Sequence, residues 1–184
     1  QMTNSGGTTY ANMHVDQHNI KNIDSNKVIF SNDGGIYYSS NGGVQVENRN
    51  DGYNVSQFYT VAIHPSTKYV IGGTQDNGSW TIGGTTLSDG NNPTGGDGAF
   101  AHIDQLDPNY QFTSSQYNNI YRSTNGGTSF SAYINYESGG ADTGLFINPS
   151  IIDPNTQTFY SSVDSNTILR STNYSQLANI STMN

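Results

Sequence analysis

Short apolar runs separated by polar, Gly-rich turns extend along the whole chain. Apolar runs occur at Val28–Phe30 and Tyr69–Ile71, and apolar and polar residues alternate at Ile20–Ile23 and Val61–Ile63. Alternation with a period of two is typical of β-strands that bury one face. No stretch carries the 3.6-residue period of an amphipathic helix. The pattern therefore predicts an all-β fold of about 16 strands with essentially no helix.

The predicted strands belong to an internal repeat. Four similar segments align, at 28–43, 69–84, 111–127 and 158–175. The equivalent residues are Tyr37, Trp80, Tyr121 and Leu169, which lie 43, 41 and 48 residues apart. A second register is given by Pro65, Pro108 and Pro154, which lie 43 and 46 residues apart. The two registers agree, so we interpret the chain as tandem copies of one structural unit.

Each unit reads as an alternating strand, a Pro/Asn/Asp turn, a second strand, a short loop, a third strand, a Gly-rich hairpin and a fourth strand. Four strands in about 45 residues are typical of a β-propeller blade. We predict a single β-propeller segment over 1–184, with antiparallel blades at 10–55, 56–100, 101–145 and 146–184. These blades either close a small ring or form part of a larger one. The alternative is a β-sandwich with accidental internal similarity.

Charge and composition exclude several classes of protein. The chain has a net charge of −8 and only six basic residues, so it lacks the basic stripe that nucleic acids require. No apolar run approaches the roughly 18 residues of a membrane span, so we expect no membrane insertion. There is no Cys, which excludes disulfides and Cys-based zinc sites. Few Lys and many Asn, Ser, Thr and Tyr residues favour a secreted or cell-surface protein of bacterial type. Because the chain begins with Gln1 rather than Met, we expect a processed or excised piece of a longer polypeptide.

A tight turn at 123–130 has the pattern S-x-N-x-G-x-S-F. It follows the strand that ends at Ser123, and it closes a hairpin. We predict that Asn125 accepts hydrogen bonds from backbone amides near Gly127, and that Gly127 adopts a positive φ without steric cost. Phe130 gives the outgoing strand an apolar anchor.

This turn resembles the Asp-box, S-x-D-x-G-x-[TS]-[WF], of BNR-type β-propellers. That group includes sialidases, sortilin-type receptor domains and xyloglucanase-type glycoside hydrolases. Asn125 stands where the family usually has Asp. Ser39, Asn41 and Gly43 repeat the start of the motif, 171–177 keeps it in part, and the second unit lacks it. Nearly the whole chain is similar to secreted bacterial BNR-repeat proteins of glycosyl-hydrolase-like type. The resemblance implies that these motif residues stabilise turns.

The segment 14–18, HVDQH, is a candidate metal site. If it forms a strand, His14, Asp16 and His18 share one face because side chains alternate. Two imidazoles and a carboxylate are suitable ligands for a divalent cation. The simpler interpretation is a polar strand face whose His residues bond to backbone.

Three acidic residues lie in predicted Gly-rich loops that emerge at one end of the blades: Asp33, Asp76 and Asp97. Glycoside hydrolysis needs two carboxylates, and Asp33 as base with Asp97 as acid is the candidate pair. The stretch around Asp33, SNDGGIY, is similar to the [TS]-D-x-G-G-x-Y stretch of xyloglucanase-type hydrolases, in which the Asp is catalytic. In this chain Gly-Gly follows Asp33 directly, one residue short of that pattern. The alternative is that all three are turn formers.

Aromatic residues are abundant, and sugar-binding surfaces stack sugars on aromatic rings. We predict Trp80 and Tyr37, with Asp76, as ligand-binding residues. The alternative is that these aromatic residues fill the blade cores, since Tyr is also a good strand residue.

Together these features favour a non-catalytic binding or structural module of a secreted or cell-surface protein. The first alternative is a glycoside hydrolase acting on a β-glucan-type polysaccharide, and the second is a sortilin-like peptide-binding propeller. No cofactor is required, although converging carboxylates could hold calcium or another divalent cation. The expected partners are a polysaccharide or a protein, and further blades or another chain at the terminal edges.

Overall fold

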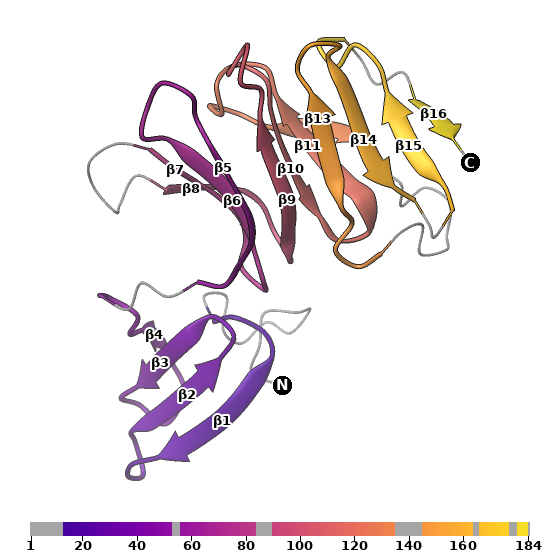
Figure 1. The fold of residues 1–184 in the computed structure, drawn as a ribbon. Helices are drawn as coiled ribbons and strands as arrows, with labels where there is room; N and C mark the ends of the chain where they lie inside the picture. The colour runs from indigo at the N-terminus through magenta and orange to yellow at the C-terminus, as the bar shows by residue number, and fades with distance from the viewer. Residues whose placement is uncertain are drawn as a thin grey trace. The chain divides into compact units, whose positions relative to one another are not determined.

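The computed structural model describes residues 13–52, 56–83, 90–134, 145–163, 166–176 and 180–183. They form four antiparallel sheets of four strands each, which confirms the predicted all-β fold of four-stranded β-propeller blades (Figure 1). These residues include one short 3₁₀ helix, Gln116–Asn118, and no helix among them is long and apolar enough to cross a membrane. The chain divides into two compact units, Gln1–Ser56 and Gln57–Asn184.

The first unit holds one sheet and the second unit holds three. The first sheet consists of β1 (Gln17–Asn22), β2 (Val28–Asn32), β3 (Gly35–Ser39) and β4 (Glu47–Asn48). The second consists of β5 (Phe58–Ile63), β6 (Val70–Thr74), β7 (Gly78–Ile82) and β8 (Gly90–Thr94). The third consists of β9 (Gly98–Ile103), β10 (Gln111–Ser115), β11 (Asn119–Ser123) and β12 (Ser131–Ile134). The fourth consists of β13 (Ser150–Asp153), β14 (Thr158–Ser162), β15 (Ile168–Ser171) and β16 (Ile180–Met183). Neighbouring strands in the sequence pair with one another in every sheet.

The turn between the first and second strands of each sheet is built in the same way. A side-chain oxygen of Asp24, Asp104 or Asp153 accepts the backbone N–H two residues further on, at 2.7–3.0 Å. In the second sheet Nδ1 of His64 accepts the N–H of Ser66 at 3.1 Å. Such turns mimic a backbone turn and fix the pairing register of the strands that they join. The sequence repeat is therefore also a repeat of turn chemistry.

The third sheet begins earlier than the repeat predicts. β8 ends at Thr94, and β9 begins at Gly98. The predicted boundary between the second and third blades, at 100/101, consequently falls inside β9. The connection is this short because Gly96 turns the chain with a φ of +68°.

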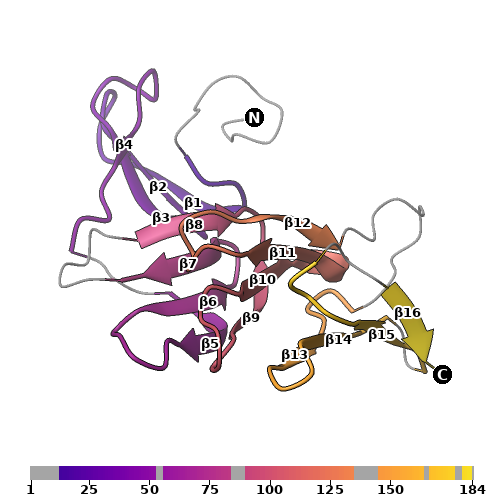
Figure 2. The same cartoon turned by 90° about the horizontal axis from the view of Figure 1, so that it is seen from above.

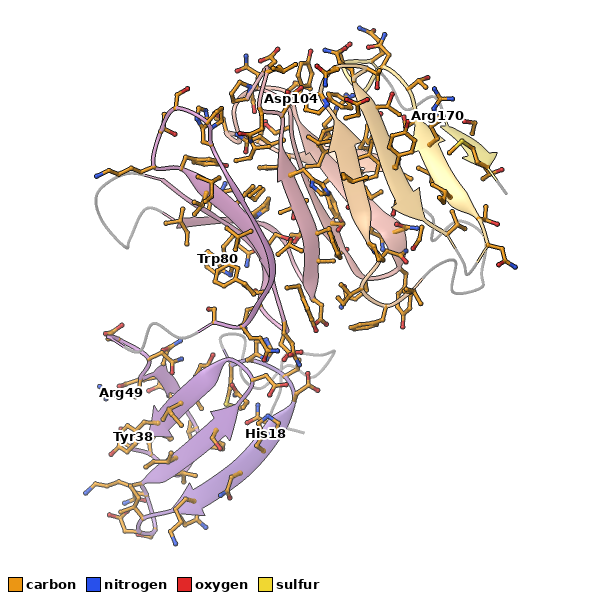
Figure 3. The ribbon with its side chains drawn as sticks, viewed as in Figure 1. His18, Tyr38, Arg49, Trp80, Asp104 and Arg170 are labelled. Carbon is orange, nitrogen blue, oxygen red and sulfur yellow. The ribbon has the colours of Figure 1, made fainter. Side chains whose placement is uncertain are left out.

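The first unit buries one face of its sheet. The buried cluster consists of Met13, Val28, Phe30 and Tyr37. Val28 and Phe30 alternate with less buried residues along β2, as expected for a strand with one apolar face. On the opposite face Arg49 lies over the ring of Tyr38, 5.4 Å from its centroid (Figure 3).

In the second unit the sheet β9–β12 lies between β5–β8 and β13–β16 (Figures 1 and 2). Its contact with β5–β8 is very close. A Cβ on Gly73 would lie 2.0 Å from the carbonyl oxygen of Ala99, so only Gly fits there. Next to it the hydroxyl of Thr60 accepts the N–H of Ala101 at 2.9 Å and donates to the carbonyl of Ala99 at 3.0 Å. Small residues and a hydroxyl therefore join the two sheets.

The contact with β13–β16 uses large side chains instead. The rings of Phe112 and Phe159 have centroids 5.2 Å apart, and Tyr174 packs on Phe112 at 5.1 Å. Ile120 and Leu169 are buried in the same cluster. Burying such a side chain stabilises a fold by about 1.5–3 kcal/mol, so this cluster is the main apolar core of the second unit.

Candidate functional site

The turns between second and third strands carry two of the three predicted acidic residues. Asp33 lies between β2 and β3, and Asp76 lies between β6 and β7. Asp97 lies between β8 and β9. Within the second unit, the β6–β7 turn and the β8–β9 connection fall at the same end of the sheet, because β5–β8 is antiparallel and its strands pair in sequence order. Asp33 belongs to the first unit, whereas Asp76 and Asp97 belong to the second.

Asp97 is buried, and both of its carboxylate oxygens accept hydrogen bonds. The backbone N–H of Asp76 donates to Oδ1 over 3.0 Å, and Nε2 of Gln116 donates to Oδ2 over 3.0 Å. Only 8% of Asp97 is exposed. Asp76 itself has a φ of +61°, a conformation that Asp tolerates better than most residues. The carboxylate of Asp97 thus ties the β6–β7 turn to the segment that follows β10.

Asp33 is paired with a histidine of the same unit. Nε2 of His18, on β1, lies within hydrogen-bond distance of Oδ1 of Asp33, as an ion pair if the imidazole is protonated. The side chain of His18 is 62% exposed and that of Asp33 is 25% exposed. This contact joins the start of β1 to the β2–β3 turn, and Figure 3 shows His18 on that edge of the sheet. Solvent can therefore reach this pair.

The predicted metal-ligand set does not share a strand face. β1 begins at Gln17, so His14 and Asp16 precede it, and the strand geometry assumed for these residues is wrong. The chain turns here because Asp16 has a φ of +59°. Nδ1 of His14 lies 3.0 Å from the carbonyl oxygen of Val15. Among the residues that the structure describes, no three His, Asp or Glu side chains lie close enough together to hold a metal ion.

The two predicted ligand-binding aromatic residues lie in different surroundings. Tyr37 is 5% exposed and belongs to the core of the first unit, so it offers no free ring face. Trp80 is half-buried on β7, and its indole Nε1 donates to the carbonyl of Asn77 at 2.9 Å (Figure 3). Trp80 therefore has a fixed ring orientation.

The two Ser-Asn-Gly turns predicted from the sequence have the same hydrogen bonds. The hydroxyl of Ser123 accepts the N–H of Gly127 at 3.0 Å, and Oδ1 of Asn125 accepts the N–H of Ser129 at 3.0 Å. The corresponding distances from Ser39 to Gly43 and from Asn41 to Gln45 are 2.9 and 2.8 Å. The prediction that Asn125 accepts a backbone amide near Gly127 is confirmed, since its Oδ1 accepts the N–H of Ser129, and the N–H of Gly127 itself donates to the hydroxyl of Ser123. Phe130 packs against Ile71, Ala101 and Ile103, and anchors the outgoing chain as predicted.

A third turn of this kind carries a buried tyrosine that the sequence did not reveal. Gly42 and Gly126 each donate a backbone hydrogen bond to the preceding turn, and Tyr174 does the same at 2.9 Å. The Tyr174 hydroxyl donates to Oδ2 of Asp104 at 2.6 Å, and both residues are at most 1% exposed. Burial and the neighbouring carboxylate raise the pKa of Tyr174 well above its usual range. Asp104 also accepts hydrogen bonds from two backbone amides. Its carboxylate therefore stabilises both this turn and the contact with Tyr174.

A second titratable residue, half-buried between two sheets, is His102 on β9. It lies between the rings of Phe100 and Phe159, and its Nε2 is 2.8 Å from the hydroxyl of Ser150. Burial lowers the pKa of His102 from 6.5 to about 4, which keeps the imidazole neutral at pH 7. It therefore acts as a polar contact between two sheets.

Comparison with protein-family models and with curated proteins finds no match. Among solved structures, an ancestral GH74 enzyme is similar with a TM-score of 0.51 and 17% identity, over 91% of this chain and 25% of that one. The GH74 xyloglucanase from Xanthomonas campestris has a TM-score of 0.38 and 15% identity, over 80% of this chain and 24% of that one. YCF48 from Cyanidioschyzon merolae has a TM-score of 0.40 and 15% identity, over 91% and 55%. The chain thus spans about a quarter of the length of the ancestral GH74 enzyme, and that likeness supports the β-propeller fold.

The buried carboxylates of this region are better placed to stabilise turns than to act as general acids or bases. General acid–base chemistry needs a carboxylate that can exchange a proton with a bound substrate. Asp97 and Asp104 are buried and bonded to amide or hydroxyl donors. Asp33 is more accessible to solvent than Asp97, and it has a histidine partner.

Proposed function

We propose that this chain is part of a non-catalytic β-propeller module, which serves a binding or structural role in an exported or cell-surface protein. The observation that carries this proposal is the use of Asp97. Both of its oxygens accept amide hydrogen bonds that hold neighbouring segments together. A general acid must reach its substrate and give it a proton, whereas both oxygens of the buried Asp97 carboxylate are occupied by donors of its own fold.

The same proposal assigns the two Ser-Asn-Gly turns to the Asp-box type. Their hydrogen bonds resemble those expected of Asp-box turns in which Asn replaces Asp, at Asn41 and Asn125. Neutral Asn supplies the same acceptor oxygen as Asp, so the turn does not depend on a charge. The proposed secretion rests on composition, namely few Lys residues and the abundance of Asn, Ser and Thr.

One observation favours a second candidate, a glycoside hydrolase acting on β-glucans. The fold is like that of an ancestral GH74 enzyme, and Asp33 lies in a solvent-accessible turn. A fold can host many functions, so the likeness raises this candidate without selecting it.

Hydrolysis assays separate the two candidates. Release of reducing ends from xyloglucan and from several β-glucans is measured for wild type, Asp33→Asn and Asp97→Asn. We expect no release by any of the three proteins above a heat-inactivated control. Hydrolysis by wild type that Asp33→Asn abolishes while the variant keeps the wild-type melting temperature would overturn the non-catalytic proposal.

A further inference from the structure

The sequence contains three Asn-Gly pairs, and each of them lies where two neighbouring strands of one sheet are joined. They are Asn41-Gly42 between β3 and β4, Asn77-Gly78 at the start of β7, and Asn125-Gly126 between β11 and β12. Asn-Gly is the pair most prone to deamidation, because Gly has no side chain to shield its backbone nitrogen. This nitrogen attacks the Cγ atom of the Asn side chain, the bond between Cγ and the amide nitrogen breaks, and ammonia leaves. Water then opens the resulting succinimide ring, which gives either Asp or isoaspartate.

In two of the pairs the attacking nitrogen is bonded to another turn of its own sheet. The N–H of Gly42 donates to the carbonyl of Asn26 at 2.6 Å. The N–H of Gly126 donates to the carbonyl of Asn109 at 3.1 Å. These acceptors lie in the β1–β2 and β9–β10 connections, at the same end of each sheet as the Asn-Gly turn (Figure 1). Because the nitrogen must lose its proton in order to attack, each of these bonds opposes the reaction.

The third pair is held by the segment that follows β8. The N–H of Gly78 donates to the carbonyl of Gly96 at 2.7 Å, and Nδ2 of Asn77 donates to the carbonyl of Gln75 at 3.2 Å. A Cβ on Gly78 would lie 2.0 Å from the carbonyl oxygen of Thr94, so the backbone is closely packed at this place. The backbone nitrogen of this pair is therefore also engaged in the folded chain.

The side chain that would be attacked is fixed as well in the two Ser-Asn-Gly turns. Oδ1 of Asn125 accepts the hydroxyl of Ser123 at 2.9 Å and the N–H of Ser129 at 3.0 Å. Its Nδ2 donates to the hydroxyl of Ser129 at 2.9 Å. Oδ1 of Asn41 accepts the two corresponding bonds of its own turn, at 3.0 and 2.8 Å. These bonds must break before the side chain can rotate towards the attacking nitrogen.

We propose that Asn41, Asn77 and Asn125 are sites of spontaneous deamidation that the folded turns suppress, so that the modification occurs only when a turn opens. The reaction consumes water, releases ammonia and needs no enzyme or cofactor. Isoaspartate adds a methylene group to the backbone, so a turn that contains it cannot re-form all of its hydrogen bonds. Asn41 belongs to the first compact unit and the other two sites belong to the second, so the modification reports on the opening of each unit separately.

Peptide mapping after incubation in oxygen-18 water measures each site, because the heavy oxygen labels only the residues that are hydrolysed during the incubation. Native buffer is compared with urea above the unfolding midpoint, and short peptides of the same sequences correct for the effect of urea on the chemistry. We expect each of the three sites to react more slowly in native buffer by a factor of about ten or more, since a local opening must come first. Deamidation of these sites in native buffer at the rate found in urea would overturn the proposal.

Asn173 is the matched control within the same chain. The N–H of the next residue, Tyr174, also donates to a carbonyl of the preceding turn, that of Gln157, at 2.9 Å. The Tyr side chain shields this nitrogen even when the turn is open. We therefore expect Asn173 to deamidate slowly both in native buffer and in urea.

The variant Ser123→Ala tests one turn against the others in a single molecule. It removes the hydroxyl that donates to Oδ1 of Asn125. We expect Asn125 to deamidate several-fold faster in native buffer, while Asn41 and Asn77 keep their wild-type rates and the circular dichroism spectrum is unchanged. Ser39→Ala should accelerate Asn41 instead. Equal acceleration at all three sites, or at none of them, would contradict suppression by the individual turns.

Discussion

Gly126 and Gly127 are neighbours in one turn, and they differ in what surrounds them. Both have positive φ, +68° and +83°. A Cβ on Gly126 would meet only Oδ1 of Asn109 at 3.8 Å, whereas a Cβ on Gly127 would lie 2.0 Å from the hydroxyl of Tyr69 and 2.7 Å from Oε1 of Gln111. Replacing either residue by Ala therefore tests backbone strain, but only Gly127→Ala also tests a close contact.

The magnitudes follow from these two terms. A left-handed conformation costs a residue with a Cβ about 1–2 kcal/mol, which is the whole effect expected of Gly126→Ala. Gly127→Ala must also displace Tyr69, whose hydroxyl donates to Gln111 at 2.9 Å. Gln111 is fully buried, and leaving its oxygen without a donor costs about 1–3 kcal/mol more. We therefore expect Gly127→Ala to lower the free energy of unfolding by about 2–5 kcal/mol in total.

Urea unfolding followed by tryptophan fluorescence measures both variants. Trp80 is the only Trp in the sequence, and it lies in the same unit as this turn. The midpoint at constant slope gives the change in stability. The double variant Tyr69→Phe with Gly127→Ala lacks the Tyr69 hydroxyl that the new Cβ would contact. Its loss of unfolding free energy should therefore be smaller than the sum of the losses in the two single variants. Equal effects of Gly126→Ala and Gly127→Ala would refute the close-contact reasoning.

Three further predictions concern buried polar groups. The pKa of His102 is lowered from 6.5 to about 4, so the unfolded chain binds a proton between these values that the folded chain does not bind. The contribution of His102 to the free energy of unfolding should be fully present above pH 6.5, and it should be lost by up to about 3 kcal/mol as the pH falls towards 4. Urea titrations at several pH values measure this dependence, which should be smaller in His102→Asn. Tyr174→Phe removes a donor from the buried carboxylate of Asp104 and should lower stability by about 1.5–3 kcal/mol, with a melting temperature equal to wild type counting against that bond. Ser123→Ala removes the acceptor of two backbone amides and should cost about 1–2 kcal/mol in urea unfolding, while Ser123→Thr should recover part of the loss.

The strand order and the turns were predictable from the sequence because both depend on local chemistry. Asp24, Asp104 and Asp153 recur before the second strand of their sheets, and each forms the same turn. The serine and asparagine of each Ser-Asn-Gly turn likewise act within five residues of one another. Alternation identified the strands, since each buries one face.

The roles of single side chains were less predictable because they depend on contacts between sheets. Tyr37 and Trp80 occupy equivalent repeat positions, yet Tyr37 is buried in the core of its unit and Trp80 is only half-buried. Tyr174 replaces a glycine of the repeat and reaches Asp104, 70 residues away. Its sequence signal is weak, namely a large residue where the other turns have Gly. The partners of Asp97 are 21 and 19 residues away, and no local pattern indicates them.

The central claim is that Asp97 is a structural acceptor, and a matched pair of variants tests it most directly. Asp97→Leu keeps the approximate shape of the side chain but removes both acceptor oxygens, so the N–H of Asp76 and Nε2 of Gln116 lose the acceptor that they share. We expect the free energy of unfolding in urea to fall by about 1–3 kcal/mol, because these donors are then left without an acceptor. Adding Gln116→Leu removes one of the two unpaired donors and should restore part of that loss. If Asp97→Leu unfolds at the same urea concentration as wild type, and Gln116→Leu changes nothing in its presence, the structural role of Asp97 is contradicted.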